Sequence, residues 1–391
     1  MKDSGIEWIG EIPEDWEVTK LKRFVKIKSG DALDKKKFID NGDIEVYGAN
    51  AKLGNYDKSN IDKESIITGR VGTIGTLDIK ANVWITDNVL AIDVFNANLK
   101  FIYYFLHILN LGELSSSTAQ PLITATKLLN INIAFPTSIN QNKISNYLDK
   151  KTKQIEDVKN TISKEIETLE NYKKSVITEA VTKGLDKNVE MKDSEIDWVG
   201  QIPVHWNLRK LKFSFKFYAG GDIDNSDFSP VETQIHKYPI LANSLENKGV
   251  IGYMSKYRFK ENTITVTGRG EVGVAYPRFM KYFPVVRLLV GVPITKIDVR
   301  YSSYCINSFI VVGEQTAMTQ LTTSKIGEYT IPNPSFEEQI KIADYLDNKC
   351  QIIDETISLK QKQLETLEEY KKSLIYEYVT GKKEVNDGEE T

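Results

Sequence analysis

An internal repeat constrains the fold of this chain more than any other feature of its sequence. Residues 1–22, MKDSGIEWIGEIPEDWEVTKLK, match residues 191–212, MKDSEIDWVGQIPVHWNLRKLK, at 13 of 22 positions. Residues 168–182 and 366–380 match as TLENYKKSVITEAVT and TLEEYKKSLIYEYVT. Each copy contains, in order, a segment rich in Trp and Pro, a variable stretch and a charged segment. This repetition predicts two units that share one fold.

The repeat also sets the domain boundaries that we expect. Two variable domains, 23–141 and 213–339, share scattered identities but differ in surface residues and in length. The other segments are a Trp/Pro segment (1–22), a long helix (142–184), a linker with the second Trp/Pro segment (185–212), a second long helix (340–382) and an acidic disordered tail (383–391). Two domains of one fold with different surfaces suit a protein that reads two targets.

The two charged segments are predicted to form long helices. Apolar residues recur every seven residues along both, which is typical of a coiled-coil seam with charged outer faces. These seam residues are Leu148, Ile155, Ile162, Leu169, Val176, Leu346, Ile353, Leu367 and Leu374. We also assign Val158 and Tyr172 to the other seam position of the first helix. Gly184 and Gly381 stand where C-terminal caps are expected.

An apolar stripe of this length must be buried, and the other copy of the helix is the natural partner. For two equivalent units to pack symmetrically, the helices run antiparallel and the two domains lie at opposite ends, related by a pseudo-twofold axis. The first Trp/Pro segment then packs near the end of the second helix. A coiled-coil stalk without a measuring role is the alternative interpretation.

The variable domains are predicted to combine short strands with helices. We expect strands at Ile44–Tyr47, 65–68, 89–92, Thr263–Thr267 and 308–312, and a helix over 99–109 capped by Asn98. The fold class is therefore α+β or α/β. It comprises two similar globular domains separated by two long antiparallel coiled-coil helices, in a pseudo-twofold repeat.

The composition limits the classes of function and the partners. The net charge is −3, and each variable domain carries 13 Lys and Arg against 12 Asp and Glu, so any basic DNA-binding face is local. Two cysteines, Cys305 and Cys350, indicate a reducing cytoplasm, and three scattered histidines give no metal-ligand spacing. No apolar run is long enough to span a membrane.

Several residues have the chemistry of DNA contacts. Arg70 and Arg269 follow strands in glycine-containing loops, where backbone N–H groups and a guanidinium can approach a phosphate. Asn50 and Asn243 are candidates because an asparagine amide can bond an adenine edge in two places. The same loops carry further candidates for phosphate contact or stacking, namely Lys52, Tyr56, Lys248 and Tyr253. The alternative for all of them is an ordinary turn or surface residue.

Three catalytic or cofactor motifs are rejected. Gly268, Gly270 and Gly273 have the spacing of a dinucleotide-binding loop, but residues 274–277 do not begin a helix. Asn333 and Pro334 lack the second proline of an amino-methyltransferase site. The sequence has no Walker A motif for ATP. We therefore predict a chain that is not itself an enzyme.

The chain resembles the DNA specificity subunits of type I restriction-modification systems. The resemblance covers essentially the whole sequence, with matching order, duplication and spacing. The matching segments are Trp8 to Trp16 with its second copy, Tyr47 to Asn50, Gly69 to Gly75, Thr86 to Asn88, Ala119 to Pro121 and Leu169 to Ser175. The second copy departs from the pattern at Ala317, Met318 and Thr319, and it has no Thr-Asp-Asn segment.

The resemblance implies a subunit with two target-recognition domains that read the halves of a split double-stranded DNA site, while the helices set the gap. It implies as partners two adenine-methylating subunits and ATP-dependent restriction subunits, which bind the helices and the Trp/Pro segments. S-adenosylmethionine, ATP and Mg would then be used by the partners, and this chain would bind no cofactor. Two other functions stay open: a fused modification or cleavage enzyme with an unrecognised active site, and a coiled-coil adaptor that does not contact DNA.

Overall fold

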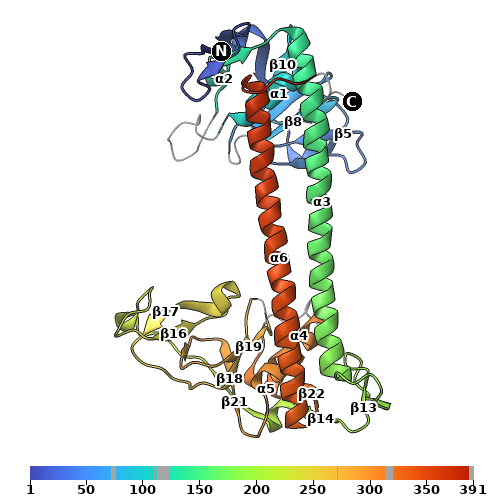
Figure 1. The fold of residues 1–391 in the computed structure, drawn as a ribbon, viewed down its shortest axis with the longest axis vertical. Helices are drawn as coiled ribbons and strands as arrows, with labels where there is room; N and C mark the ends of the chain where they lie inside the picture. The colour runs from blue at the N-terminus through green and yellow to red at the C-terminus, as the bar shows by residue number, and fades with distance from the viewer. Residues whose placement is uncertain (72–75, 110, 112–122, 271, 313–319, 387–391) are drawn as a thin grey trace. The chain divides into compact units, whose positions relative to one another are not determined.

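The computed structural model of the chain describes residues 1–71, 76–109, 111, 123–270, 272–312 and 320–386. It contains two compact units, one formed by Met1–Ile162 with Gln361–Thr391 and the other by Ser163–Lys360. Each unit combines one variable domain, one Trp/Pro segment and a piece of both long helices (Figure 1). Each unit therefore draws on both copies of the repeat.

The variable domain of the first unit contains two sheets. The larger is antiparallel, in the order β4 (Val25–Ser29), β10 (Val89–Val94), β7 (Ser65–Gly69) and β8 (Leu77–Lys80). The smaller has the order β6 (Lys52–Tyr56), β5 (Ile44–Tyr47) and β9 (Val83–Ile85). All residues of the inner strand β7 are buried, which explains why its sequence is a continuous run and not an alternation.

Helix α1 (Leu99–Ile108) packs against β7 and β8 and begins where predicted, because the Asn98 side chain accepts a hydrogen bond from the Phe101 backbone N–H at 2.9 Å. Phe101, Ile102 and Phe105 form its buried face. The unit is completed by short elements: β1 (Lys2–Asp3), β2 (Glu11–Ile12), β3 (Glu17–Lys20), η1 (Leu21–Arg23), η2 (Lys35–Lys37), α2 (Ala125–Leu129) and β11 (Asn132–Phe135), which pairs with β3.

The second unit repeats these elements in the same order, which confirms the predicted duplication of one fold. Its larger sheet is β15 (Phe215–Ala219), β21 (Leu288–Pro293), β18 (Thr263–Thr267) and β19 (Ala275–Arg278). Its smaller sheet is β17 (Val250–Met254), β16 (Tyr238–Leu241) and β20 (Phe283–Pro284). The short elements are β12 (Met191–Asp193), β13 (Gln201–Pro203), β14 (Asn207–Lys210), η3 (Leu211–Phe213), η4 (Asn225–Asp227), η5 (Glu246–Gly249), α5 (Thr323–Gly327) and β22 (Thr330–Asn333).

One predicted strand of the second domain is wrong. Residues 308–312 form the last turns of helix α4 (Val299–Val312), the counterpart of α1. The Asp298 side chain starts this helix by accepting hydrogen bonds from the N–H groups of Arg300 and Tyr301, at 2.8 and 3.1 Å. A β-branched run has only a weak strand preference, and continuation of a capped, packed helix overrides it.

The two long helices are α3 (Ser138–Lys183) and α6 (Phe336–Val379). Each begins four residues before the predicted start, at 138 instead of 142 and at 336 instead of 340. The reason is a hydroxyl cap after a proline: the Thr137 Oγ1 accepts from the Asn140 N–H at 3.4 Å, and the Ser335 Oγ accepts from the Glu338 N–H at 3.2 Å.

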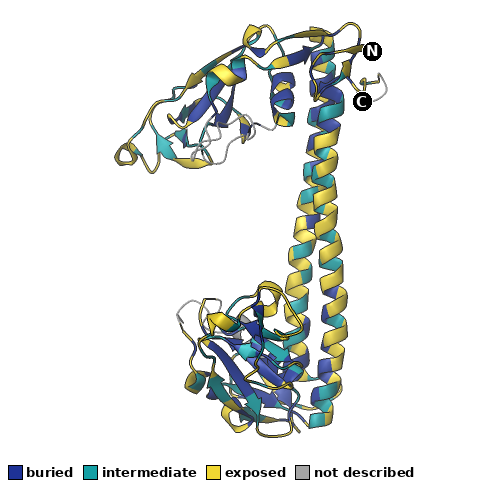
Figure 2. Cartoon of the chain, turned by 90° about the vertical axis from the view of Figure 1, so that its left-hand side faces the viewer, coloured by how far each residue is buried: buried dark blue, intermediate teal, exposed yellow. Residues whose placement is uncertain are grey.

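Within each unit, α3 and α6 pack side by side and antiparallel (Figure 1). The predicted seam residues lie where the two helices face each other and are buried or half-buried. The buried ones are Leu148, Ile155, Ile162, Val176, Leu346, Ile353 and Leu374, and Leu169 and Leu367 are half-buried. The buried stripe along the facing sides of the helices contrasts with their exposed outer faces (Figure 2).

The other seam position of α3 was predicted wrongly. Val158 and Tyr172 are 48% and 52% exposed. The seam alternates steps of four and three residues from Ile155, so its second position is occupied by Lys159 and Lys173, one residue further along. The sequence pattern favours the apolar residues Val158 and Tyr172, because a lysine is not expected at a seam position.

Each seam lysine is paired with a carboxylate of the opposite helix. In the first unit, the Lys159 Nζ lies 2.6 Å from the Glu368 Oε2, and the Lys371 Nζ lies 2.7 Å from the Glu156 Oε1. The hydrogen bond from Lys371 is the main cause that lowers the pKa of Glu156. This stabilisation is therefore present at neutral pH and is lost as the pH falls through the folded-state pKa.

The second unit has the same type of pair. The Lys173 Nζ lies 2.6 Å from the Asp354 Oδ2, and the Lys360 Nζ lies 2.6 Å from the Glu165 Oε2. Half-exposed pairs contribute little stability, typically below about 1 kcal/mol each. Their position in the seam makes them determinants of register, because a slipped pairing would leave lysines against apolar residues.

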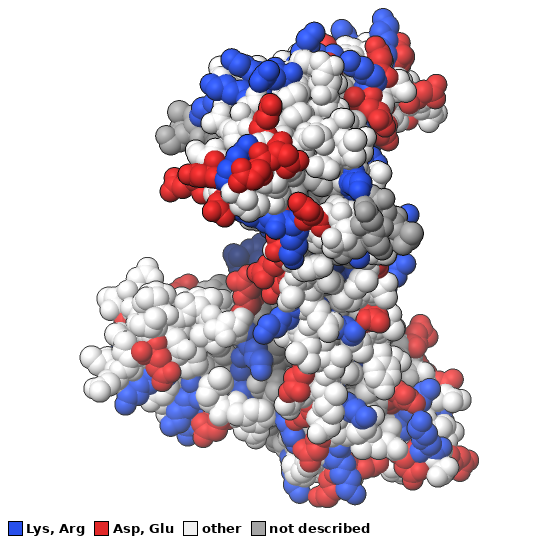
Figure 3. Space-filling model, turned by 45° about the horizontal axis from the view of Figure 1, so that its top comes forward, with Lys and Arg blue, Asp and Glu red and all other residues white. Residues whose placement is uncertain are grey.

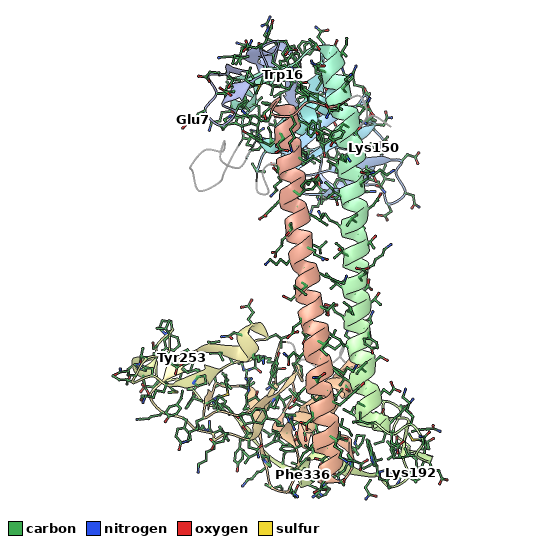
Figure 4. The ribbon with its side chains drawn as sticks, in the orientation of Figure 1. Glu7, Trp16, Lys150, Lys192, Tyr253 and Phe336 are labelled. Atoms are coloured by element: carbon green, nitrogen blue, oxygen red, sulfur yellow. The ribbon has the colours of Figure 1, made fainter. Side chains whose placement is uncertain are left out.

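The first Trp/Pro segment packs on the end of α6, as predicted. The Tyr376 hydroxyl donates to the Trp8 carbonyl at 2.9 Å, and the Lys382 Nζ donates to the Glu11 carbonyl at 2.6 Å. Figure 4 shows Trp16 beside this helix end. Gly381 has a positive φ of 72°, and an added Cβ would lie 2.4 Å from the Pro13 Cδ. In the second unit, Trp206 packs in the same way against Gly184 after α3.

We predict that Gly381→Ala destabilises the first unit by about 2–4 kcal/mol, because the left-handed backbone and the contact with Pro13 both oppose a side chain. Thermal unfolding of the purified chain measures this change. Gly5→Ala is the matched control, since Gly5 has a φ of 65° and open space around it. Equal losses in both variants would contradict a packing role for Gly381.

One buried glutamine in each unit helps to attach the variable domain to its long helix. The Gln141 Oε1 accepts from the Asn98 N–H at 2.9 Å, and its Nε2 donates to the Pro136 carbonyl at 2.9 Å. Gln339 accepts from the Asp298 N–H at 3.0 Å and donates to the Pro334 carbonyl at 3.1 Å. These amides join the start of α1 or α4 to the start of α3 or α6.

Gln339→Ala is expected to cost about 1–3 kcal/mol, because it leaves a buried N–H and a buried carbonyl without partners. Gln351→Ala, on an exposed face of the same helix, should change the unfolding free energy by less than about 0.5 kcal/mol. Denaturant unfolding of both variants tests this. An equally small effect at Gln339 would show that water replaces the amide.

Candidate nucleic-acid interface

Each variable domain carries a two-stranded hairpin in its smaller sheet, β5–β6 in the first and β16–β17 in the second. Both hairpins are braced from one side by an aromatic ring on a glycine. An added Cβ at Gly54 would lie 2.5 Å from Phe38, and one at Gly252 would lie 2.5 Å from Phe228. Figure 4 labels Tyr253 on the second of these hairpins.

The two domains differ in length at this hairpin. The matched strands begin at 25 and 215 (β4 and β15), at 44 and 238 (β5 and β16), and at 52 and 250 (β6 and β17). The offset therefore rises from 190 to 194 before the hairpin, and from 194 to 198 across its tip. The tip spans 48–51 in the first domain and 242–249 in the second, so four added residues lie there.

Arg70 and Arg269 lie in matching loops but not at matching positions. Gly69 pairs with the first residue of β10 and Thr267 with that of β21, while the carbonyls of Arg70 and Gly268 accept from Ile123 and Leu321. Hydrogen bonding thus makes Arg70 the structural equivalent of Gly268. The sequence motifs Thr68-Gly69-Arg70 and Thr267-Gly268-Arg269 match Arg70 with Arg269 instead, one residue further along. Aligning the glycines hid this shift.

The environments of the two arginines also differ. Arg70 is half-buried, and its Nη1 donates to the Ser29 Oγ at 3.0 Å. Arg269 is exposed in the loop after β18. The equivalent loop of the first domain, 72–75, lies outside the described residues, as does the segment 112–122 that contains Ala119, Gln120 and Pro121.

The two candidate asparagines are in different situations. The Asn243 Oδ1 accepts from the Gly268 N–H at 2.7 Å, and its Nδ2 donates to the Val286 carbonyl at 3.4 Å. The Asn243 amide therefore joins three loops of the domain, which is the structural role of a turn residue. Asn50 is exposed at the tip of the first hairpin.

The charged and aromatic candidates of the first hairpin interact with their own sheet. Lys52 lies 2.8 Å from Glu45, and this hydrogen bond is the main cause that lowers the pKa of Glu45. The Tyr56 ring contacts the edge of Trp84 at a centroid distance of 5.3 Å. The positive charge of Lys52 is thus partly neutralised before any ligand binds.

The candidates of the second hairpin have fewer partners within the domain. Lys248 is exposed at the tip, and Tyr253 is half-buried on β17. Behind the tip lies Arg278, which is only 3% exposed. Sequence reasoning missed Arg278, because an arginine at the end of a strand is ordinarily a surface residue.

Charged side chains of both signs occur on the surface of the chain. On the face shown in Figure 3, basic and acidic side chains are interspersed, in agreement with the near-neutral count of each domain. Among the described residues, no cluster of three His, Cys, Asp or Glu side chains could hold a metal ion. In the same part of the chain, no helix has the length and apolarity needed to cross a membrane.

The model of the protein family described as type I restriction modification DNA specificity domain matches residues 13–168 and 203–369. The chain belongs to this family. The two matches correspond to the two copies of the repeat, so each half of this specificity-family chain carries one family domain.

Individual relatives agree with this assignment. A putative type I specificity subunit of Mycoplasma pneumoniae is 30% identical over 193 residues, which are 45% of this chain and 56% of that protein. A second such protein is covered over 47% of its length, so the chain spans about half the length of these two relatives. The putative type I restriction enzyme MjaX specificity subunit of Methanocaldococcus jannaschii is 26% identical, with 96% of this chain and 95% of that protein covered.

A solved structure supports the fold of the specificity family. The chain aligns with a TM-score of 0.72 and 12% identity to a protein from a study of complex assembly and conformational transition of the type I R-M system. The alignment covers 94% of this chain and 98% of that one. At this identity, the similarity concerns the fold alone.

We predict that Arg70→Ala weakens DNA binding by the assembled complex, because the guanidinium stands in a loop where it can contact a phosphate. Binding measured across a salt series should fall for all sequences, and the dependence of log K on log salt should decrease by about one. Arg23→Ala, an exposed arginine bonded to Thr19, is the control. Unchanged affinity at every salt concentration would remove Arg70 from the interface.

Proposed function

We propose that this chain is the DNA sequence-specificity subunit of a type I restriction-modification complex. Its two variable domains act as target-recognition domains, and each reads one half of a bipartite double-stranded DNA site. The observation that carries this proposal is that one fold occurs twice with different hairpin tips. A protein that reads two different sequences needs the same scaffold and different contact residues.

The partners follow from the same proposal. Methyltransferase subunits and ATP-dependent restriction subunits would bind the long helices and the Trp/Pro segments, and this chain would contribute no catalytic centre. S-adenosylmethionine, ATP and Mg would be used by those partners. The exposed outer faces of α3 and α6 support this role, because they leave long charged surfaces available for other proteins.

An exchange of one variable domain tests the proposal. The junctions should be placed at 24 and 130, because the strand pair β3–β11 and the Gln141 amide then stay with the recipient chain. Replacing 24–130 by the equivalent domain of another family member should change one half of the methylated sequence and leave the other half unchanged. Sequencing of methylated adenines in cells that also express the methyltransferase measures this.

Two outcomes would contradict the proposal. An unchanged methylation motif after the exchange would support a coiled-coil adaptor without DNA contact. Methylation of DNA by the purified chain alone, with S-adenosylmethionine, would support a fused enzyme. A chain in which 24–130 is replaced by its own sequence through the same cloning junctions is the control.

A further inference from the structure

The second variable domain contains a buried arginine with an unusual set of partners. The Arg278 Nε donates to the Thr265 Oγ1 at 2.8 Å, and its Nη2 donates to the Lys248 carbonyl at 2.8 Å. Its guanidinium lies 5.1 Å from the centre of the Tyr276 ring. Among the described residues, no carboxylate lies within ion-pair distance of Arg278. A buried cation without an anion is costly, so its contacts need an explanation.

Arg278 holds a strained turn. Asn247 and Lys248 have positive φ angles of 46° and 51°, and Gly249 follows with 88°. A left-handed conformation is unfavourable for residues with a Cβ and persists only where the surrounding structure imposes it. Here it is imposed by the bond from Arg278 and by the 2.8 Å bond from the Ala242 N–H to the Gly249 carbonyl.

The first domain lacks this arrangement. Lys80 occupies the position of Arg278, because Ser65 pairs with Lys80 as Thr263 pairs with Arg278. Lys80 lies 2.9 Å from Asp78 and 5.2 Å from the Tyr47 ring centre, and it makes no bond to the tip 48–51. The brace and the left-handed tip therefore occur only where the hairpin is longer.

We infer that the tip 242–249 reads base edges in the major groove of double-stranded DNA through Asn247 and Lys248, and that Arg278 is a positioning residue for this tip. The inference rests on the proposed function and names the reading element of the second domain. A two-stranded β-ribbon fits the major groove, lysine can donate to guanine O6 and N7, and asparagine can pair with adenine N6 and N7.

Binding to phosphate alone explains the tip less well. Glu246 and Lys248 are its only charged residues, so the tip has no net charge with which to attract the DNA backbone. A flexible lysine contacts phosphate without a fixed backbone, whereas base edges require defined donor directions. A rigid, neutral tip with exposed polar side chains is what base reading requires.

Glycine substitutions at the tip separate recognition from folding. In Asn247→Gly and Lys248→Gly, the left-handed backbone is relieved, so the stability of the chain should be unchanged or slightly increased. The methylated motif should lose discrimination about 5- to 150-fold at one or two positions of a single half-site. Sequencing of methylated adenines in cells that express each variant with the methyltransferase measures this loss. Asn262→Gly is the matched control, because Asn262 is exposed and left-handed (φ 61°) in the same domain, outside the hairpin.

The arginine is tested through the tip. Arg278→Met should reduce base discrimination at the same motif positions as Lys248→Gly, and Arg278→Lys should retain part of it. The Arg278→Met/Lys248→Gly double variant should lose no more discrimination than Lys248→Gly alone. If Arg278→Met does not fold, the two glycine variants decide the inference.

An unchanged motif in both glycine variants overturns the inference, as does an affinity loss that is equal for all DNA sequences. Exchange of the whole second variable domain distinguishes the two levels of the argument. If that exchange changes the motif while the tip variants do not, the reading element lies elsewhere in the domain. If the exchange also has no effect, the proposed function itself fails.

Discussion

The antiparallel packing of α3 against α6 is the interaction on which both units depend. Each unit joins segments of α3 and α6 that are far apart in the sequence. The first unit combines Met1–Ile162 with Gln361–Thr391, whereas the second is the continuous stretch Ser163–Lys360. Apolar seam residues supply the burial, but a continuous apolar stripe permits several registers. The lysines at 159, 173, 360 and 371 favour the observed register, because each lies beside a carboxylate of the opposite helix in it.

The features that the sequence predicts well are those determined locally or by the repeat. The Asn98 cap, the Gly184 and Gly381 caps and the heptad positions depend on neighbouring residues or on a period of seven. Because of the repeat, most of these features occur in both copies of the sequence, and each copy supports the prediction for the other. Residues 308–312 were mistaken for a strand, because the decision depends on Asp298 ten residues earlier and on packing against the sheet.

The candidate interface was predictable by residue type and loop, but not residue by residue. Sequence chemistry selects Asn243 for its amide, which the fold uses to join loops, and Lys52 for its charge, which Glu45 shares. Arg278 has no sequence signal, because its importance comes from burial and from the carbonyl of Lys248. Such pairings exist only in three dimensions.

The duplication explains how recognition can diverge without loss of the fold. The equivalent inner strands β7 and β18 have the same length, and the buried amides of Gln141 and Gln339 make equivalent bonds. Between β15 and β18 the second copy gains eight residues, and these lie on either side of β16, in the loop before it and in the tip after it. Insertions there leave the core and the helix seam untouched. The hairpin is therefore where two copies of one scaffold can acquire different ligand contacts at the least cost in stability.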